Sequence, residues 1–504
     1  MCGGVFPRLL LLLLPVLGWS HGCLQDPASA YRFSGAVCRL TYPAAVVLNE
    51  KTTKVIEAAF QHARYPSLKG EKSLGFGSKL IYGLDNLEIY NLSIGRSAFE
   101  LLPSEGIAME ISNVSAVFRG TIQYGYGSWL VNFGHSIDFE IESQIDLGIN
   151  PKLYCGGGKV AADTSDCYLN FHKLHLLLQG DREPNWLKKL FTNFITFTVK
   201  LAIKGQICKE INKVANILAD FIQERAEHFL ADGDISVDIG ITAPPVITAN
   251  YIESYHKGLT NYKNTTAVIT ESVFQPQQLT EHKMLYFWVS DEMFNPIVTA
   301  AHQDGRFKLN ISGTELTELF KTNFSNTIPE FFQKCLLDSG STELRVWSSS
   351  TPSLNTSSLG TTVRAQASGH LHCGSSQTPT LYFQMDIATA VTASYAHKKV
   401  MLHSKATEIF AVITGGEALQ QYEPLSPEHG AVVAFITEAV ERIGIPKVLS
   451  VLANEVTRLL DNQGTYLFDI YNPEVLPQDG YVVIQMDFGF PHHLLVEFLQ
   501  RTLQ

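Results

Sequence analysis

The chain has 504 residues and a net charge of −11, with charged residues at only 17% of positions and hydrophobic residues at 45%. These values exclude a disordered chain, which needs low hydrophobicity and high net charge, and a coiled coil, which is rich in charged residues. The negative charge argues against nucleic-acid binding, because that needs lysine and arginine to neutralise phosphates. We therefore expect a large folded protein with unusually much apolar surface.

The N-terminus predicts a secreted, extracellular protein. The apolar run Leu9–Leu17 follows Arg8 and precedes Ser20-His21-Gly22, which is the order of a secretory signal peptide. We expect residues 1–22 to be removed. No later stretch approaches the ~18 consecutive apolar residues of a transmembrane helix, so we expect no membrane span.

Two further features fit export. Asn-x-Ser/Thr sequons predict glycosylation, which needs solvent-exposed positions, at Asn91, Asn113, Asn264, Asn310, Asn323 and Asn355. After removal of the signal peptide seven cysteines remain: Cys23, Cys38, Cys155, Cys167, Cys208, Cys335 and Cys373. An odd number leaves at least one thiol free or in an intermolecular bond.

The first half begins with a predicted strand and helix. Ala36–Leu48 has strand character, and Asn49 is expected to cap a helix over Glu50–Ala63. From Lys79 to Gln179 apolar residues alternate with polar ones, which predicts antiparallel strands with one solvated face.

A long helical block follows. Its apolar residues recur every three or four positions from Trp186 to Leu230, and Gly205 is expected to interrupt it. More strands are predicted up to about Lys263.

The polar segment 264–283 has no periodicity and is interpreted as a linker. After it the same order of elements recurs. The predicted elements are a strand (284–289), a helix (291–302), strands (306–403) with a Ser/Thr-rich loop (348–362), a helical block (428–462) interrupted at Gly444 and Pro446, and strands (466–470 and 481–488).

This repeated order predicts an α+β fold of two similar halves, each a twisted, half-closed sheet holding a long helix. The expected domains are residues 23–263 and 284–489, joined by the linker 264–283 and followed by a C-terminal helix over 490–504.

No catalytic motif stands out. Gly134-His-Ser-Ile-Asp138 lacks the last glycine of the nucleophile elbow and opens an alternating strand. His172 and His175 are expected on opposite faces of a strand, which is unsuitable for a shared metal. There is also no zinc-protease motif and no phosphate-binding loop. We therefore expect a binding or carrier protein, not an enzyme, with no metal and no cofactor.

The C-terminus predicts an amphipathic helix that Pro491 can start. On a helical wheel its apolar face covers more than half the circumference. Two interpretations stay open. The helix packs on the C-terminal half, or it is a mobile lid that exchanges protein contacts for lipid contacts.

Segments 191–213, 251–258 and 467–491 closely resemble the lipid-transfer and lipopolysaccharide-binding proteins with the bactericidal/permeability-increasing fold. The resemblance runs from about Ala36 to the end and is poorest over 325–380.

It implies an elongated boomerang. Two similar barrels of twisted antiparallel strands, each with a long helix, are joined by a central antiparallel sheet. A through-running apolar tunnel would hold neutral lipid, with phospholipids at its openings. The resemblance also implies a Cys167–Cys208 disulfide and leaves Cys335 and Cys373 unassigned.

The resemblance further implies lipid-binding residues. Polar side chains near the lipid would be Gln223, Arg225, Ser254 and His256, although ordinary structural hydrogen bonding is an equal alternative. In the terminal helix, lipid would be contacted by Leu494, Leu495, Phe498 and Leu499, with Glu497 on the solvated side.

The implied function is transfer of cholesteryl esters, triglycerides and phospholipid between plasma lipoproteins of high, low and very low density. The protein is expected to be a monomer. Its only bound groups are expected to be lipids. An alternative is a lipopolysaccharide- or phospholipid-binding protein of the same fold, although recognition of an anionic lipid favours clustered basic residues. A lipid hydrolase is disfavoured by the missing elbow.

Overall fold

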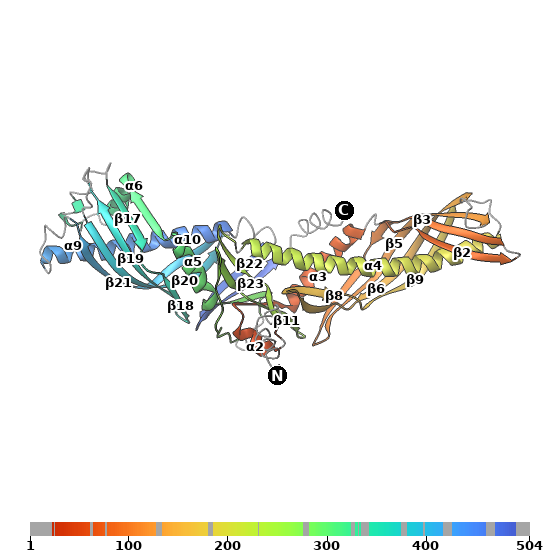
Figure 1. The fold of residues 1–504 in the computed structure, drawn as a ribbon, viewed down its shortest axis with the longest axis horizontal. Coiled ribbons are helices and arrows are strands. Elements are labelled where there is room, and N and C mark those ends of the chain that lie inside the picture. Colours follow the sequence, from red (N-terminus) through yellow and green to blue (C-terminus); the bar gives the residue numbers. More distant parts are fainter. Residues whose placement is uncertain are drawn as a thin grey trace, which may run out of the picture.

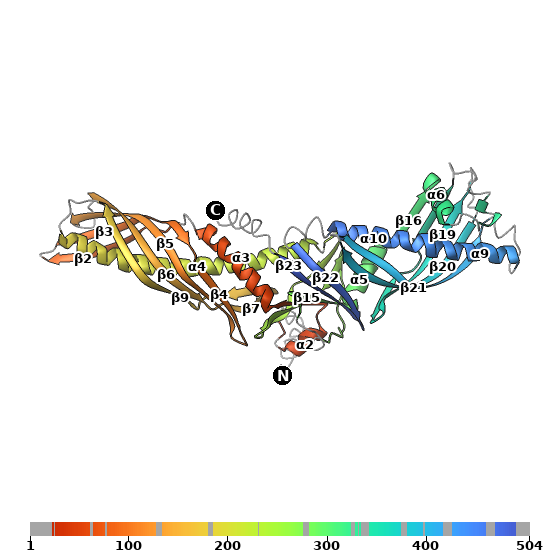
Figure 2. The same ribbon diagram turned by 180° about the vertical axis from the view of Figure 1, so that it is seen from behind.

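The molecule is elongated, with one large sheet at each end and a third between them (Figures 1 and 2). The computed structural model describes residues 23–24, 26–60, 64–75, 78–127, 134–179, 185–229, 231–275, 282–323, 328–330, 332–333, 342–373, 381–396, 399–416, 426–459 and 469–489.

The N-terminal sheet is antiparallel and packs against a 45-residue helix. Its strands, in spatial order, are β2 (Leu68–Gly75), β3 (Ser78–Ser93), β5 (Gly106–Gly127), β6 (His135–Ile149) and β9 (Cys167–Gln179), with β4 (Arg96–Leu102) beside β5. The hairpin β7 (Lys152–Gly156) and β8 (Lys159–Asp163) and the helices α3 (Tyr42–Phe60) and α4 (Asn185–Phe229) complete this half.

The central sheet joins strands from both halves of the sequence. Its order is β11 (Ile241–Ile247), β12 (Tyr251–His256), β1 (Ala36–Thr41), β15 (Leu285–Ser290), β23 (Tyr481–Gly489) and β22 (Asp469–Gln478), with every neighbour antiparallel. Around it lie α2 (Pro27–Arg32) and a small sheet of β10 (Ile235–Asp238), β13 (Leu259–Tyr262) and β14 (Thr265–Thr266).

The C-terminal half repeats the plan of a sheet with long helices. Its strands are β16 (Lys308–Ser312), β17 (Glu343–Ser348), β19 (Gly360–His372), β20 (Leu381–Ala396) and β21 (Lys399–Gly415), with β18 (Ser353–Ser357) beside β19. Its helices are α5 (Asp291–Gln303), α6 (Gly313–Asn323), α9 (Pro427–Ala439), the π-helical η2 (Val440–Gly444) and α10 (Ile445–Leu459).

The α+β class and the duplicated order are confirmed, but the barrels are not closed. Among the described strands, β2 does not pair with β9, and β16 does not pair with β21. Each half is a curved open sheet with helices packed on it, as the alternating strands alone predicted.

The core of the N-terminal half follows from two periodicities. Along β6, residues such as Ile137, Phe139 and Ile141 alternate inward, while α4 turns a buried residue to the sheet every fourth position at Ile195, Val199 and Ile203. Apolar burial of this kind contributes roughly 25 cal/mol per Å² to folding. The inward face of the strands and the buried stripe of α4 pack together in one hydrophobic cluster, and this packing holds α4 along the sheet.

Two glycines let the sheets curve beneath aromatic rings. Gly148 lies directly across from Tyr168, and Gly369 directly across from Phe383. A Cβ at either glycine would collide with the opposing ring. Aromatic rings that cover a strand glycine in this way stabilise curved sheets.

The first predicted strand is too long. β1 ends at Thr41, and α3 begins at Tyr42, seven residues before the predicted cap. Pro43 explains this because its fixed φ favours the first turn of a helix. Asn49 is therefore inside α3, where it is buried and exchanges hydrogen bonds with Ser97.

Two predicted helix breaks are also wrong. α4 continues through Gly205, because packing of its buried residues outweighs the ~1 kcal/mol that glycine costs in a helix. Near Gly444 the chain stays helical, with a π-helical segment between α9 and α10. Pro446 is accommodated in the first turn of α10.

Pattern analysis missed the elements α2, β2, β14, β18 and α6, and it misplaced a histidine. Helix α6 lies within the predicted run of strands, and β18 within the predicted loop. A register shift between β6 and β9 adds a residue at His172, so that His172 and His175 are both exposed. A β-bulge reverses the alternation in this way, and the His172 ring hydrogen-bonds the Asp146 carboxylate.

Candidate functional site

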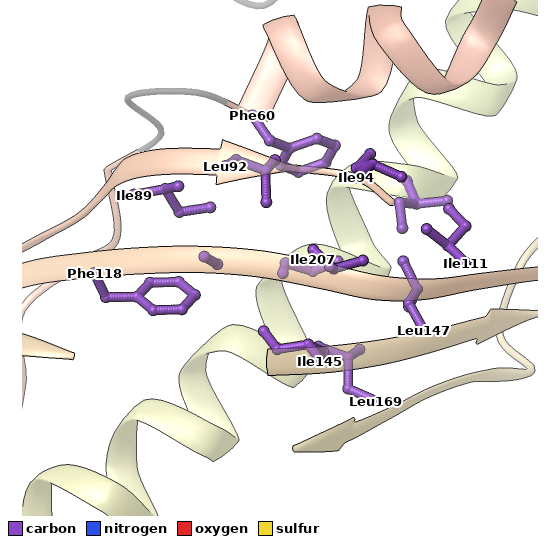
Figure 3. Close-up of a pocket in the computed structure, with 13 residues that line it drawn as sticks. Phe60, Ile89, Leu92, Ile94, Ile111, Phe118, Ile145, Leu147, Leu169 and Ile207 are labelled. Carbon is purple, nitrogen blue, oxygen red and sulfur yellow. The ribbon is translucent and has the colours of Figure 1, made fainter. Parts of the chain in front are cut away.

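An apolar cavity lies inside the N-terminal half, between the sheet and its two helices. Figure 3 shows its side chains pointing toward one another from the strands and from α3 and α4. The lining residues are Phe60, Ile89, Leu92, Ile94, Ile111, Val114, Ala116, Phe118, Ile145, Leu147, Leu169, Ile207 and Ile211. The cavity between them has a volume of about 40 Å³, so the sheet and helices must move apart to admit a lipid chain.

All thirteen lining residues are apolar. Such a cavity offers no hydrogen bond to water, which makes it suited to hydrocarbon. Sequence analysis did not single out these residues, because cavity-lining positions share the alternation of ordinary core positions.

The central sheet has two unlike faces. On one face the side chains of Arg39, Glu253, Tyr286 and Trp288 are fully buried. The other face is apolar and only half-buried. Cross-strand register places on it Leu40, Ile252, Leu285, Phe287, Val289, Ile484 and Met486. We call this second set the apolar face of the central sheet.

Ser254 and His256 lie on this apolar face, beside Cys38 and Ala36 of β1. The His256 Nδ1 atom is 2.8 Å from the Ile239 carbonyl oxygen, which can only accept, so Nδ1 carries a proton. The Ser254 Oγ atom is 2.9 Å from His256 Nε2. Burial lowers the pKa of His256. In the neutral ring Nε2 is an acceptor, so Ser254 donates to it.

Cys38 is the free cysteine among the described residues, and it hydrogen-bonds Ser254. Burial, aided by the negative charge of Glu253, raises the pKa of the Cys38 thiol to about 12. The thiol is therefore protonated at neutral pH and is not an activated nucleophile. The three side chains form a short self-satisfied polar chain on an otherwise apolar surface.

The opposite face of the central sheet holds a buried charge network. Arg39 Nη2 lies 2.7 Å from Glu253 Oε2, and both side chains are almost fully buried. The hydroxyls of Tyr31 and Tyr255 donate to the same carboxylate, and burial together with this charge raises both tyrosine pKa values. The Arg39 guanidinium also lies over the Tyr251 ring at 3.9 Å. This network packs β1, β12 and α2 together.

The structure describes only some of the other residues that were expected to contact lipid. Gln223 is on α4, and its Nε2 donates to Glu227 at 2.8 Å. Arg225 is on the same helix, although its side chain is outside the described set. The terminal residues Leu494, Leu495, Glu497, Phe498 and Leu499 lie outside the described residues altogether. Thus the structure brings together Ser254 and His256 from this group.

Disulfides hold the N-terminal half in two places. Cys167 of β9 is joined to Cys208 of α4, and Cys23 is joined to Cys155 of β7. Cys373 is also disulfide-bonded. The Cys23–Cys155 bond closes a loop of 132 residues that the spacing of cysteines could not specify.

The sequons can be located on the surface. Five of the asparagines are exposed: Asn91, Asn113, Asn264, Asn310 and Asn355. The side chain of Asn323 lies outside the described set.

Within the described part of the chain, no helix is both long and apolar enough to cross a membrane. In that same part, no three His, Cys, Asp or Glu side chains are grouped as metal ligands.

Comparison with known proteins identifies the family. The LBP / BPI / CETP family N-terminal domain matches residues 47–220, and its C-terminal domain matches residues 230–407. Cholesteryl ester transfer protein of Homo sapiens is 43% identical over 97% of this chain and 98% of its own, and that of Gallus gallus is 40% identical over 99% of both. Lipopolysaccharide-binding protein of Mus musculus is 24% identical over 55% of this chain and 57% of its own. The chain belongs to the LBP / BPI / CETP family.

Proposed function

We propose that this protein is a lipid transfer protein that carries cholesteryl esters, triglycerides and phospholipid between lipoprotein particles. The apolar cavity of the N-terminal half carries the proposal, because thirteen apolar side chains enclose a space without a polar group. The near full-length similarity to cholesteryl ester transfer proteins supports the substrate class.

The physical task is to lower the barrier to escape from a particle. A neutral lipid is held there by ~0.8 kcal/mol for each buried methylene, so its passage through water is slow. An apolar cavity replaces most of the lost contacts. The gradient of lipid composition drives exchange, and no covalent step is needed. We accordingly propose a carrier and not an enzyme.

Ser254 and His256 fit a role in orienting the lipid ester. They provide the polar part of the apolar face. When the Ser254 hydroxyl turns away from His256 Nε2, it can donate to an ester carbonyl, while His256 keeps its bond to Ile239. We propose that Gln223 and Arg225 act at the same lipid from α4.

We also propose that the protein is secreted and acts in plasma on high-, low- and very-low-density particles. The signal-like residues 1–22 support export. The exposure of five sequon asparagines supports glycosylation.

A transfer assay with a doubly labelled ester tests the proposal. Donor particles carry cholesteryl ester labelled in both the sterol and the acyl chain, and acceptor particles are re-isolated after incubation with the protein. We expect both labels on the acceptor in unchanged ratio. No movement above the protein-free control would favour a binding protein of the lipopolysaccharide-binding type, and labelled free fatty acid would show a hydrolase.

A further inference from the structure

The outward side of α4 carries a ridge of exposed residues at every fourth position. Opposite the buried stripe of Ile195, Val199 and Ile203 lie exposed side chains of both apolar and basic type. The ridge consists of Lys189, Asn193, Phe197, Leu201, Gly205, Lys209 and Lys213. Steps of four residues advance 40° per turn, so the buried stripe and this ridge wind around the helix together. We call these seven residues the outer ridge.

The middle of the outer ridge is strongly apolar. Phe197 is 65% exposed and Leu201 is 57% exposed. They are one helical turn apart and therefore form a single patch. Exposure of two large apolar side chains on a helix whose other side is already packed indicates a contact that the described part of the chain does not supply.

The surroundings of this patch are basic, in contrast to the protein as a whole. Residues 185–213 contain six lysines and one acidic residue, a local charge of +5 in a chain of net charge −11. Lys200 and Lys204 are exposed beside the ridge, and Lys200 lies over the Phe171 ring. None of the ion pairs between described residues uses a lysine of this segment.

We propose that the outer ridge of α4 docks onto an anionic phospholipid surface. Phe197 and Leu201 insert among the headgroups, and the flanking lysines pair with phosphates. Apolar side chains bordered by lysines are the pattern of helices that lie in a lipid interface. The position fits, because α4 runs along the outside of the N-terminal half for its whole length (Figure 1). A polar or acidic protein partner would leave the two apolar side chains unsatisfied.

Docking of the outer ridge can occur whether or not the protein transfers lipid, and only its biological purpose rests on the proposed transfer function. It is tested on the full chain by flotation with vesicles of phosphatidylcholine alone or phosphatidylcholine with phosphatidylserine. We expect the F197S/L201S variant to lower partitioning at least about tenfold on phosphatidylserine vesicles. We expect K204E/K209E to lower it on these vesicles and to abolish its sensitivity to salt.

Matched controls change equally exposed residues elsewhere. Val268 and Leu359 are 75% and 77% exposed, so V268S/L359S should partition within about twofold of the unmodified chain. K399E/K405E, at exposed lysines of β21, should likewise retain binding. Unchanged folding of each variant is verified by its urea midpoint.

Three results would overturn the proposal. Binding by F197S/L201S equal to that of the unmodified chain excludes the ridge. A change in oligomeric state on that substitution assigns the ridge to a second copy. Stronger vesicle binding after deletion of residues 490–504 would show that this segment, and not a lipid surface, covers the outer ridge. The lipid carried by purified protein, measured in a solvent extract, reports separately on the proposed function. Its absence would contradict neutral-lipid carriage but not ridge docking.

Discussion

Glu253 is the carboxylate on which the buried polar contacts of the central sheet converge. It accepts from Arg39 Nε at 2.8 Å and from the Tyr255 hydroxyl at 2.7 Å, and it also accepts from Tyr31. Glu253→Gln would leave the Arg39 charge buried without its counter-charge. We expect unfolding to become easier by about 3–5 kcal/mol, measured by urea denaturation.

The half-exposed pair of Arg119 and Glu140 provides the control. Its Nε–Oε2 distance is also 2.8 Å, but its side chains are 43% and 22% exposed. Because solvent screens this pair, Glu140→Gln should cost less than about 1 kcal/mol. Equal losses in the two variants would contradict the importance assigned to burial.

The lowered pKa of His256 predicts that the folded protein loses stability in acid. Its pKa is lowered in the folded protein by burial, so the unfolded chain binds the proton more readily. Stability is then complete above the unfolded pKa of about 6.5 and declines as pH falls through that value toward the folded pKa. We expect His256→Gln to flatten the pH dependence of the unfolding free energy below pH ~6.5. An unchanged slope would show that His256 does not titrate in this way.

The positions of the candidate site residues could be predicted only in part. Ser254 and His256 could be named by resemblance, but their proximity to Cys38 depends on the pairing of β1 with β12, more than 200 residues apart. Likewise Phe60 and Ile207 reach the cavity through helices far apart in sequence. Alternation reveals an inward-facing residue without revealing whether it meets another side chain or a space.

At the scale of elements, periodicity predicted types better than boundaries. The alternating strands and the long helix α4 follow from their patterns, because each pattern has many residues. The start of α3 and the continuity at Gly205 depend on single residues whose local preference tertiary packing overrides. Helix α6 was missed because its 11 residues lie within a run of strands.

Gly205 and Gly148 predict opposite effects of the same substitution. At Gly205 an added Cβ meets no atom within 4 Å, whereas at Gly148 it collides with the Tyr168 ring. Gly205→Ala should stabilise the protein by about 0.5–1 kcal/mol because alanine favours a helix. Gly148→Ala should destabilise it by about 1–3 kcal/mol. Thermal or urea denaturation of both variants measures this, and changes of the same sign would contradict the account.

We propose that the terminal segment 490–504 acts as a lid on the lipid-binding interior, and not as a helix that only packs on the C-terminal half. Deletion of residues 493–504 should reduce transfer of neutral lipid more than it reduces secretion or the urea midpoint, because the apolar side of the helix would contact lipid. F498S/L499S should have the same effect, whereas Q500S/Q504S on the polar side should not. Unchanged ester transfer by the deletion variant would exclude the lid.

At the scale of the whole molecule, the shared central sheet unites the two halves. β1 and β12 come from the first half, β15 and β23 from the second, and β1 pairs directly with β15. The duplicated order was visible in the sequence, but the open edges of the two outer sheets were not, because closure depends on strand pairing and curvature. The low charge content is consistent with a cavity and a half-buried apolar face in addition to an ordinary core.

We propose that lipid passes through the apolar interior of the N-terminal half. This proposal is tested most directly by the transfer rate of intact cholesteryl ester by two variants of β5. Ala116 lines the cavity, and its neighbour Ser115 is exposed on the opposite face. Ala116→Trp fills the space and should lower transfer at least about fivefold while the protein stays folded, since overpacking costs about 1–3 kcal/mol. Ser115→Trp should transfer like the unmodified chain. Equal transfer by both variants, with both folded, would contradict the account.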